Sequence, residues 1–331
     1  MTPFTPPFLD SLRSATRSKT IAVVGDVMID RYIWGKVNRI SPEAPVPVVE
    51  VESESHRLGG AANVAANIAS LGATALLVGV VGDDADGRMF REILVQQNAS
   101  ADGIVSDPSR PTTVKTRVIA HDQHVVRIDS EAKSDVAASI AQQLYEAVER
   151  NIASIDGIIV EDYNKGVVTA DLIRSLIALA NRHNTIITID PKFHHFFEYT
   201  DVTVFKPNRK ETEDALGRKL VNEEDVRTAG RELLERLRAK NILLTRSEKG
   251  MSLYRADGSE HHFPTNARSV VDVSGAGDTV IATLTVMLAA GATVPEAAAL
   301  ANIAGGIVCG SVGIVPIDPD ELIAVALGQG R

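Results

Sequence analysis

The stretch Val271–Thr279 holds the residues best suited to chemistry. Gly275, Ala276 and Gly277 allow the backbone to turn tightly with its N–H groups converging, and the apolar run after Asp278 predicts that the turn opens a helix. A helix N-terminus combines unpaired amides with the positive end of the helix dipole, so it favours an anion. The chemistry that this turn suits is therefore the holding of a phosphate during its transfer.

Asp278 lies at the mouth of this expected anion site, where a carboxylate would compete with a phosphate for the same amides. One interpretation is that Asp278 faces the nucleophile, orients a substrate hydroxyl and accepts its proton while the amides hold the phosphoryl group. The other is that Asp278 caps its own helix, as aspartate often does. These nine residues alone do not separate the two interpretations.

Composition limits the class of protein. With 331 residues, 44% of them hydrophobic and 23% charged, the chain is typical of a globular protein with one large α/β domain or two smaller ones. The net charge of -9 argues against nucleic-acid binding, which needs a basic face. A single cysteine, Cys309, excludes an intrachain disulfide, and no apolar run has the length of a membrane span. We therefore expect a cytoplasmic protein that binds neither nucleic acid nor membranes, with a loose N-terminal arm over residues 1–19.

The first half of the chain predicts buried strands and a small β-sheet lid. Residues 21–25 form a β-branched run that ends in glycine, which is typical of a buried strand, and residues 74–82 predict another. Prolines exclude a helix before residue 47, and the alternation up to Val51 indicates an edge strand. The strands expected at 114–120 and 125–129 would complete the lid with the strand at 45–51. We place the lid segments at about residues 31–57 and 112–130, inserted in a domain that spans residues 20–325.

From residue 134 onward, helical and strand patterns alternate. This rhythm predicts an α/β fold with a mostly parallel central sheet and helices on both faces. The expected helices lie at 134–152, 170–182, 277–290 and 295–309, and the expected strands at 157–161, 185–190, 202–205, 242–245, 251–254 and 261–264. In open α/β sheets, ligands gather at the carboxyl ends of the strands. The polar residues that follow the strands there are Asp162, Asn164, Lys165, Asp190, Lys192, Lys206, Asn208 and Glu211.

Two motifs far apart in the chain resemble the signatures of one enzyme family. The run Gly59–Ala65 with Leu71–Gly72, and the run Asp272–Asp278, stand in the order found in the ribokinase/PfkB family of sugar kinases. Residues 25–32, 39–48, 161–166 and 245–251 are further similar to the heptose-phosphate kinases of that family. The resemblance covers about residues 20–325 and implies a ribokinase-like fold with a β-sheet lid.

The resemblance also implies a reaction. It is the ATP- and Mg²⁺-dependent phosphorylation of D-glycero-β-D-manno-heptose 7-phosphate at its anomeric hydroxyl, which gives the 1,7-bisphosphate on the route to the lipopolysaccharide inner core. A different kinase of the family, acting on a hexose phosphate or a nucleoside, stays open, as does a non-catalytic sugar-phosphate-binding regulator on the same fold. In relatives this kinase is often fused to a nucleotidyltransferase domain; because the sequence ends at Arg331, we expect a separate protein to supply that activity.

Residue roles follow from the resemblance position by position. Asp278 matches the catalytic base, with the amides of Gly275, Ala276 and Gly277 as its anion hole. Val273 departs from the threonine that many members have, which leaves no hydroxyl at that position. The sugar-contacting positions are Asp26, Asp30, Gly59, Gly60 and Asn63; the nucleotide-binding positions are Asn208, Thr245, Glu248, Gly250, Asp272 and Asn302; the magnesium-associated positions are Asn208 and Glu211.

The substrate's own phosphate needs cations, and the sequence offers several. Lys165, Lys192, Arg117 and Arg127 lie near the predicted ligand edge or the lid, and a solvated surface role stays open for each. Asp162, at the same edge, completes the expected substrate-binding set. Exposed strand edges in a lid are usually covered. In the family such lids pair across a two-fold axis, so the resemblance implies a homodimer.

Overall fold

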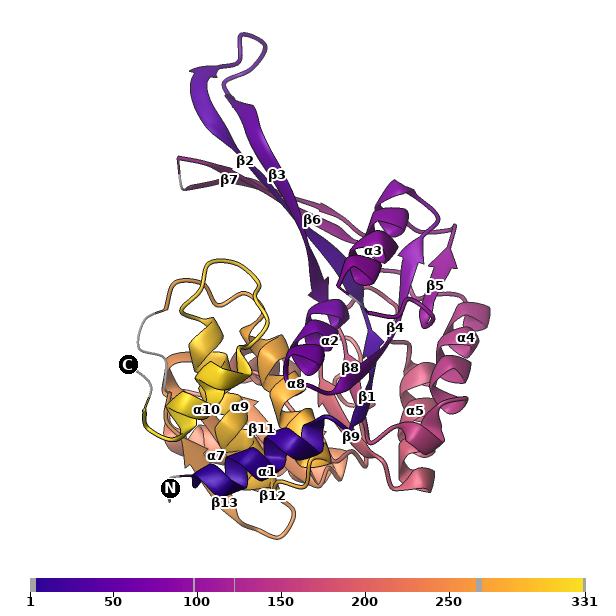
Figure 1. Ribbon diagram of the computed structural model, residues 1–331, viewed down its shortest axis with the longest axis vertical. Helices are drawn as coiled ribbons and strands as arrows, with labels where there is room; N and C mark the ends of the chain where they lie inside the picture. Colours follow the sequence, from indigo (N-terminus) through magenta and orange to yellow (C-terminus); the bar gives the residue numbers. More distant parts are fainter. Residues whose placement is uncertain (1–3, 98, 122, 266–269, 330–331) are drawn as a thin grey trace.

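A large sheet positions every part of the candidate site. The structure, a computed structural model, describes residues 4–97, 99–121, 123–265 and 270–329. Among these residues the large sheet has the strand order β13-β12-β11-β10-β9-β8-β1-β4-β5, with parallel pairing from β5 to β11 and antiparallel pairing at β12 and β13 (Figure 1). The strands are β1 (Thr20–Gly25), β4 (Thr74–Gly82), β5 (Ile104–Asp107), β8 (Gly157–Glu161), β9 (Ile186–Asp190), β10 (Val204–Phe205), β11 (Asn241–Thr245), β12 (Met251–Arg255) and β13 (Glu260–Phe263).

Helices cover both faces of this sheet, as the alternation of helix and strand patterns predicts. Because side chains alternate along a strand, β1 sends Ile21 and Val23 into one apolar core and Ala22 and Val24 into the other. The first core is built with α1 (Pro6–Thr16), α2 (Ala61–Ser70), α3 (Ala85–Gln96), α8 (Ala276–Ala289), α9 (Val294–Val308) and α10 (Pro319–Ala326), and the second with α4 (Ala138–Glu149), α5 (Ala170–His183), α6 (Arg209–Leu216) and α7 (Glu223–Leu237). None of the helices in the described residues is both long enough and apolar enough to span a membrane. The predicted α/β fold with a mostly parallel sheet is confirmed.

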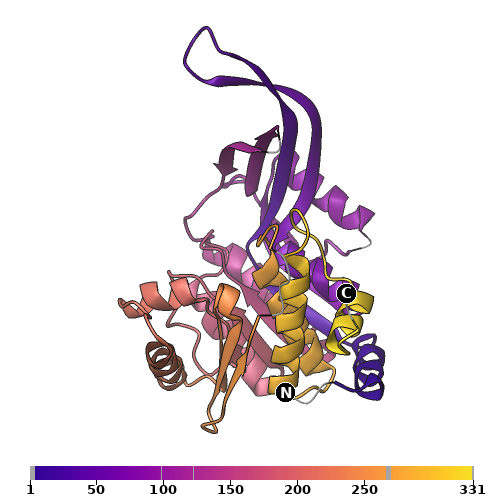
Figure 2. The same cartoon turned by 90° about the vertical axis from the view of Figure 1, so that its left-hand side faces the viewer.

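A second sheet stands off the first and forms the lid. Its order is β3-β2-β6-β7, with β2 (Val27–Ile40), β3 (Pro47–Gly60), β6 (Val114–Ala120) and β7 (Gln123–Ser130). Figure 2 shows β2 and β3 as a long curved ribbon that projects from the body. The predicted strands near residues 45–51 and 114–130 do belong to one sheet, and β2 lies between them and pairs with both.

The prediction of a loose arm over residues 1–19 is wrong for residues 4–19, because they carry α1; residues 1–3 lie outside the described residues. Pro6 and Pro7 occupy the first two positions of this helix, where proline is well tolerated, so the prolines begin a helix here. Leu9 and Leu12 are buried in the first core, and the buried Thr16 hydroxyl donates a hydrogen bond to the Leu71 carbonyl (2.9 Å). The N-terminal segment is therefore part of the packed domain.

We expect Leu12→Ala to lower the free energy of unfolding by about 2–5 kcal/mol, because a buried leucine loses its contacts and leaves a cavity. Asp10→Ala, at an exposed position of the same helix, should change the free energy of unfolding by less than about 0.5 kcal/mol. Denaturant unfolding of both variants measures the difference. Equal, small effects would show that α1 does not contribute to the packed core.

Candidate active site

The turn before α8 has the geometry of an anion site. Gly275 takes φ 79°, in the left-handed region, and no side chain caps the helix that follows it. A Cβ at Gly275 would lie 2.8 Å from Nδ2 of Asn63, so only glycine lets the turn approach the first turn of α2 this closely. Ala276 N–H donates to the Val273 carbonyl at 3.3 Å, so this predicted anion-hole amide is engaged within the turn, although Gly275, Ala276 and Gly277 all line the cavity.

Asp278 is buried in the first turn of α8 and is held by two side chains from other elements. Its Oδ2 accepts a hydrogen bond from Nδ2 of Asn63 on α2, and its Oδ1 accepts one from the hydroxyl of Tyr163 after β8, both at 2.7 Å. The carboxylate therefore does not serve as the cap of α8, and the capping interpretation is wrong. Burial raises the pKa of Asp278 to about 6, while the hydrogen bonds from Asn63 and Tyr163 lower it.

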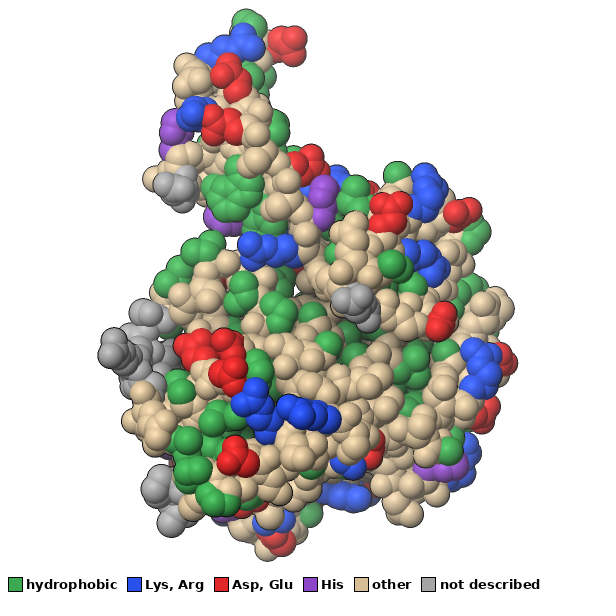
Figure 3. All heavy atoms as spheres, viewed as in Figure 1, with side chains coloured by type: hydrophobic (Ala, Val, Ile, Leu, Met, Phe, Trp, Pro, Cys, Tyr) green, Lys and Arg blue, Asp and Glu red, His purple; other side chains and the backbone are tan. Residues whose placement is uncertain are grey.

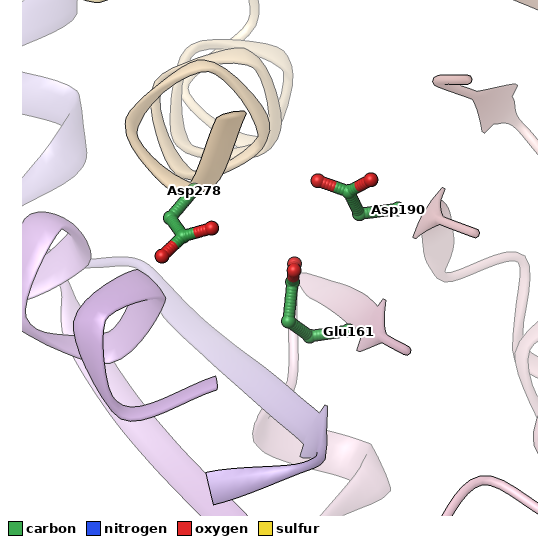
Figure 4. Close-up of side chains that lie close together, drawn as sticks. All are labelled: Glu161, Asp190 and Asp278. Atoms are coloured by element: carbon green, nitrogen blue, oxygen red, sulfur yellow. The ribbon is translucent and has the colours of Figure 1, made fainter. Parts of the chain in front are cut away.

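Three carboxyl groups meet at this point. Glu161 at the end of β8, Asp190 at the end of β9 and Asp278 on α8 each place an oxygen within 4.8 Å of the others, and Figure 4 shows the three side chains converging. Asp190 is compensated by the buried ammonium of Lys206, which lies 2.7 Å from its Oδ2. Lys206 also approaches the Gly277 backbone closely, 3.7 Å from where a Cβ would be. A positive charge thus faces the amide turn.

Glu161 is the exception in this cluster. Both of its carboxyl oxygens are buried, and neither has a hydrogen-bond partner among the described residues. Burial, followed by the negative charges of Asp190 and Asp278, raises the pKa of Glu161 well above its ordinary range. The environment therefore favours the neutral acid, which limits the negative charge around Asp278.

A cavity of about 510 Å³ opens beside Asp278, which is within the size range of small-molecule sites. It is bounded by the predicted anion turn and by predicted nucleotide-binding residues, which come from three separate parts of the chain. The predicted site residues that line the cavity are Lys192, Asn208, Thr245, Glu248, Gly250, Gly275, Ala276, Gly277, Asp278 and Asn302. Gly250 also has a backbone reason to be glycine, because φ is 76° and a Cβ would lie 2.0 Å from the Phe263 carbonyl oxygen. The last predicted nucleotide residue, Asp272, does not line the cavity; it accepts the backbone N–H groups of Ser274 and Gly313.

Asn208 and Glu211, the residues predicted to hold magnesium, form the capping box of α6. Asn208 caps α6 by accepting the Glu211 N–H, and Glu211 Oε2 accepts the Asn208 N–H in return, both at 2.8 Å. Glu211 Oε1 lies 2.7 Å from the Lys192 ammonium. A carboxylate has about four lone-pair positions, so Glu211 keeps capacity for a cation or its water shell. Asn208 and Glu211 can therefore supply only part of the ligands of a Mg²⁺ ion, and water or phosphate oxygens would supply the rest.

The predicted sugar contacts separate into two groups. Asp26 is buried and accepts the backbone N–H groups of Tyr163, Lys165 and Val167, so it anchors the loop that carries Tyr163. Burial, then the charge of Asp162, raises the pKa of Asp26 to about 6. Asp162 is itself buried and accepts the Tyr199 hydroxyl at 2.9 Å. Asp26 and Asp162 therefore accept hydrogen bonds from the protein itself and stabilise the loop after β8. Their contact with substrate stays a prediction.

The second group lies at the base of the lid. Asp30 is buried and pairs with Arg117 of β6, and burial raises its pKa although Arg117 lowers it. Gly59 lies against Asp30, since a Cβ there would be 2.2 Å from Asp30 Oδ2. Gly60 leads from β3 into α2 with φ 59°, which brings Asn63 to Asp278. The glycine pair thus connects the lid to the residues that hold Asp278.

The predicted phosphate-binding cations already have acidic partners. Lys165 pairs with Glu131 at 2.8 Å, and Lys192 pairs with Glu211. Arg127 is exposed on β7 and pairs with Asp129 at 3.0 Å. Arg117 pairs with Asp30. The structure therefore does not bring these four residues together as one cationic site.

Sequence reasoning missed part of the site. Asp190 and Lys206 stood out as polar residues after strands but were given no role, and Glu161 and Tyr163 were not singled out. The sheet-edge rule could have found Glu161, since it is the last residue of a strand whose other residues are apolar. No sequence signal indicates that the Tyr163 hydroxyl reaches residue 278.

We expect the unfolding free energy of Glu161→Gln to increase relative to the native protein as pH rises from about 5 to about 8. The native fold holds the Glu161 proton above pH 4.5, where the unfolded chain releases it, so the native protein loses stability with rising pH and the variant lacks this loss. Denaturant unfolding at about pH 5 and about pH 8 measures the difference in unfolding free energy between the variant and the native protein. Glu235→Gln, at an exposed position, is the control. The same pH dependence in the two variants would contradict a neutral Glu161.

Comparisons with known proteins agree with the fold. The fold is similar to that of Arabidopsis thaliana ribokinase complexed with ribose and ATP (19% identical, TM-score 0.74), covering 93% of this chain and 98% of that one. It is also similar to phosphofructokinase-2 from Escherichia coli in complex with potassium (18% identical, TM-score 0.76), covering 95% and 100% of the two chains. The ribokinase-like fold is thus confirmed.

Relatives with higher identity carry the name bifunctional protein HldE. The protein of Paramagnetospirillum magneticum is 44% identical over 93% of this chain and 63% of its own length, and that of Syntrophotalea carbinolica is 42% identical over 95% and 64%. The protein of Helicobacter pylori is 43% identical over 94% and 67%. The chain spans about two thirds of the length of these relatives. The model of the pfkB family carbohydrate kinases matches residues 18–320, so the chain belongs to this family of ATP-dependent sugar kinases.

Proposed function

We propose that the chain transfers the terminal phosphoryl group of ATP to the anomeric hydroxyl of D-glycero-β-D-manno-heptose 7-phosphate, in the cytoplasm, for ADP-heptose and lipopolysaccharide biosynthesis. The observation that carries the proposal is the placement of Asp278. It is a buried carboxylate at the mouth of an amide turn, beside a cavity of nucleotide size. The identity to the HldE proteins and the four motifs shared with heptose kinases support this acceptor over another sugar.

In the proposed reaction, Asp278 orients the acceptor hydroxyl and accepts its proton. Asn63 and Tyr163 fix the carboxylate, and a carboxylate that accepts two hydrogen bonds still has lone pairs for a third. The pKa of about 6 matches a base that works near neutral pH, since proton transfer is most efficient when the two values are close.

The phosphoryl group would meet the amides of the α8 turn and the Lys206 ammonium. Charge in the transition state of phosphoryl transfer spreads over the equatorial oxygens, so fixed positive groups lower the barrier more than a strong base does. Mg²⁺, when bound, would neutralise the phosphate oxygens of ATP, and Asn208 and Glu211 are the residues proposed to hold it or its water shell. Thr245, Glu248 and Asn302 would border the nucleotide.

We further propose that the lid forms a homodimer contact. Val126 and Ile128 on the edge strand β7, and Val51 on the edge strand β3, are exposed apolar residues of the lid. Unpaired strand edges with apolar side chains favour pairing with another sheet. A second copy of the chain would cover them.

The purified chain should convert heptose 7-phosphate and ATP to the 1,7-bisphosphate and ADP, with a higher kcat/KM than for fructose 6-phosphate, ribose or adenosine. Coupled ADP release and ³¹P NMR of the product measure rate and position. A preference for one of the other acceptors would replace the heptose assignment within the same family. An absence of turnover with all of them would favour a binding protein.

Asp278→Asn should bind ATP with nearly native affinity and lose on the order of 10²- to 10⁴-fold in kcat, the contribution of a general base. In the native enzyme kcat/KM should fall as pH drops below about 6, because the protonated carboxyl cannot accept the hydroxyl proton. Steady-state kinetics against pH and ATP titration measure both effects. Near-native turnover by the variant would remove Asp278 from the chemical step.

Ile128→Glu should shift the native dimer toward the monomer, because a carboxylate would be desolvated in the lid contact. Val221→Glu, at an exposed apolar position in the loop before α7, serves as the control and should leave the mass unchanged. Light scattering at several protein concentrations measures the mass. A native chain that is monomeric throughout would exclude the lid dimer.

A further inference from the structure

The acceptor proposed above carries a phosphate of its own, and Arg57, at the base of the lid, is an arginine that no described carboxylate pairs with. No carboxylate of the described residues lies within ion-pair distance of Arg57, which lies on β3 two residues before Gly59. Its Nη1 donates to the backbone carbonyls of Ile314 (3.0 Å) and Val312 (3.4 Å). Backbone carbonyls orient the guanidinium without neutralising it.

Arg57 and Arg117 share one aromatic platform. Their guanidinium carbons lie 5.3 Å and 5.4 Å from the centre of the Tyr32 ring, and Tyr32 is buried. Stacking on an aromatic ring holds a guanidinium in place and leaves its N–H edge available for a planar or tetrahedral oxyanion. Two arginines thus contact one ring, from β3 and β6, the strands on either side of β2.

The strand register places this pair on the face of the lid that carries Asp30. Asp30 is directly opposite Arg57, and Tyr32 is directly opposite Arg117; side chains two residues apart on a strand share a face. Asp30 also pairs with Arg117. The predicted sugar contact and the two arginines therefore lie side by side at the base of the lid.

One residue separates Arg57 from the anion turn. Ile314, whose carbonyl accepts the Arg57 hydrogen bond, has its Cγ2 3.4 Å from where a Cβ of Gly275 would be. In the space-filling view, a recess lies between the lid and the body, with a basic side chain at its edge (Figure 3). A sugar that places one end at Asp278 could therefore present its other end to the arginine pair.

We propose that Arg57 and Arg117, stacked on Tyr32, form the binding site for the phosphate monoester of the acceptor. The inference rests on the proposed function only in taking the acceptor to be a sugar phosphate. Arg57 supplies the charge that no acidic side chain compensates, and Arg117 adds N–H donors beyond the one that Asp30 uses. Asp30 and Asp272 are the acidic groups nearby, and the latter is occupied by the backbone amides of Ser274 and Gly313. Charge-assisted, bidentate hydrogen bonds from arginine are well suited to a phosphate.

The test compares Arg57→Ala, Arg57→Lys and the control Arg39→Ala with the native enzyme. Arg39 is an exposed residue toward the tip of β2. Each is assayed with heptose 7-phosphate and with heptose that lacks the phosphate. In Arg57→Ala the ratio of kcat/KM for the phosphorylated over the unphosphorylated acceptor should fall about 10- to 100-fold, the range of one hydrogen bond to a charged group. Arg57→Lys should keep part of this preference, and Arg39→Ala should retain all of it.

An equal loss with both acceptors would overturn the inference, since it would mean that Arg57 only fastens the 312–314 loop to the lid. An unchanged ratio would overturn it as well. The acceptor preference of the native enzyme tests the proposed function separately. If the native enzyme prefers another sugar phosphate, the same ratio is measured with that acceptor, and if it shows no preference for any phosphorylated acceptor, both proposals fall.

Discussion

The site depends on two hydrogen bonds to one buried carboxylate. Asn63 from α2 and Tyr163 from the loop after β8 both donate to Asp278 at the start of α8, so three distant segments of the chain meet at a single side chain. The Tyr163 loop is anchored in turn by Asp26, which accepts three of its backbone amides. Gly60 and Gly275 are required for the close approach of these segments, because each takes a positive φ where a side chain would clash. Much of what connects the lid, the sheet and the anion turn therefore serves to fix the direction in which Asp278 points.

Electrostatics explains why such an arrangement is tolerated. A buried carboxylate is costly unless it is compensated, and here three carboxyl groups lie together. Lys206 compensates Asp190 directly, and the neutral form of Glu161 avoids a third negative charge. The outcome is a carboxyl group with a pKa of about 6, next to an ammonium and a helix N-terminus that favour an anion, as the proposed base requires. In a site built this way, charges are placed before the substrates arrive, which is how phosphoryl transfer is accelerated.

The fold and the tight turn that begins α8 are predicted correctly because both depend on local patterns. The alternation of apolar strands and helices predicts the sheet, and the Gly-Ala-Gly turn before an apolar run predicts the helix N-terminus. Three features could not be read in this way. The packing of α1 depends on tertiary contacts of Leu9 and Leu12; the pairing of β2 between β3 and β6 depends on long-range register; and the approach of Tyr163 and Arg57 to the site depends on loop geometry. For Asn208 and Glu211 a local pattern is present but has two meanings. The same Asn-x-x-Glu spacing is a helix capping box and a motif of the family, so the sequence alone does not separate the two roles.

The most direct test of this account is a crystal structure of the enzyme with heptose 7-phosphate and a non-hydrolysable ATP analogue. The account predicts that the anomeric hydroxyl oxygen lies about 2.6–3.2 Å from an Asp278 carboxylate oxygen, with the terminal phosphoryl group against the amides of the α8 turn. It would be contradicted by a ternary complex in which Asp278 contacts only Asn63 and Tyr163 while the hydroxyl and the phosphoryl group meet elsewhere.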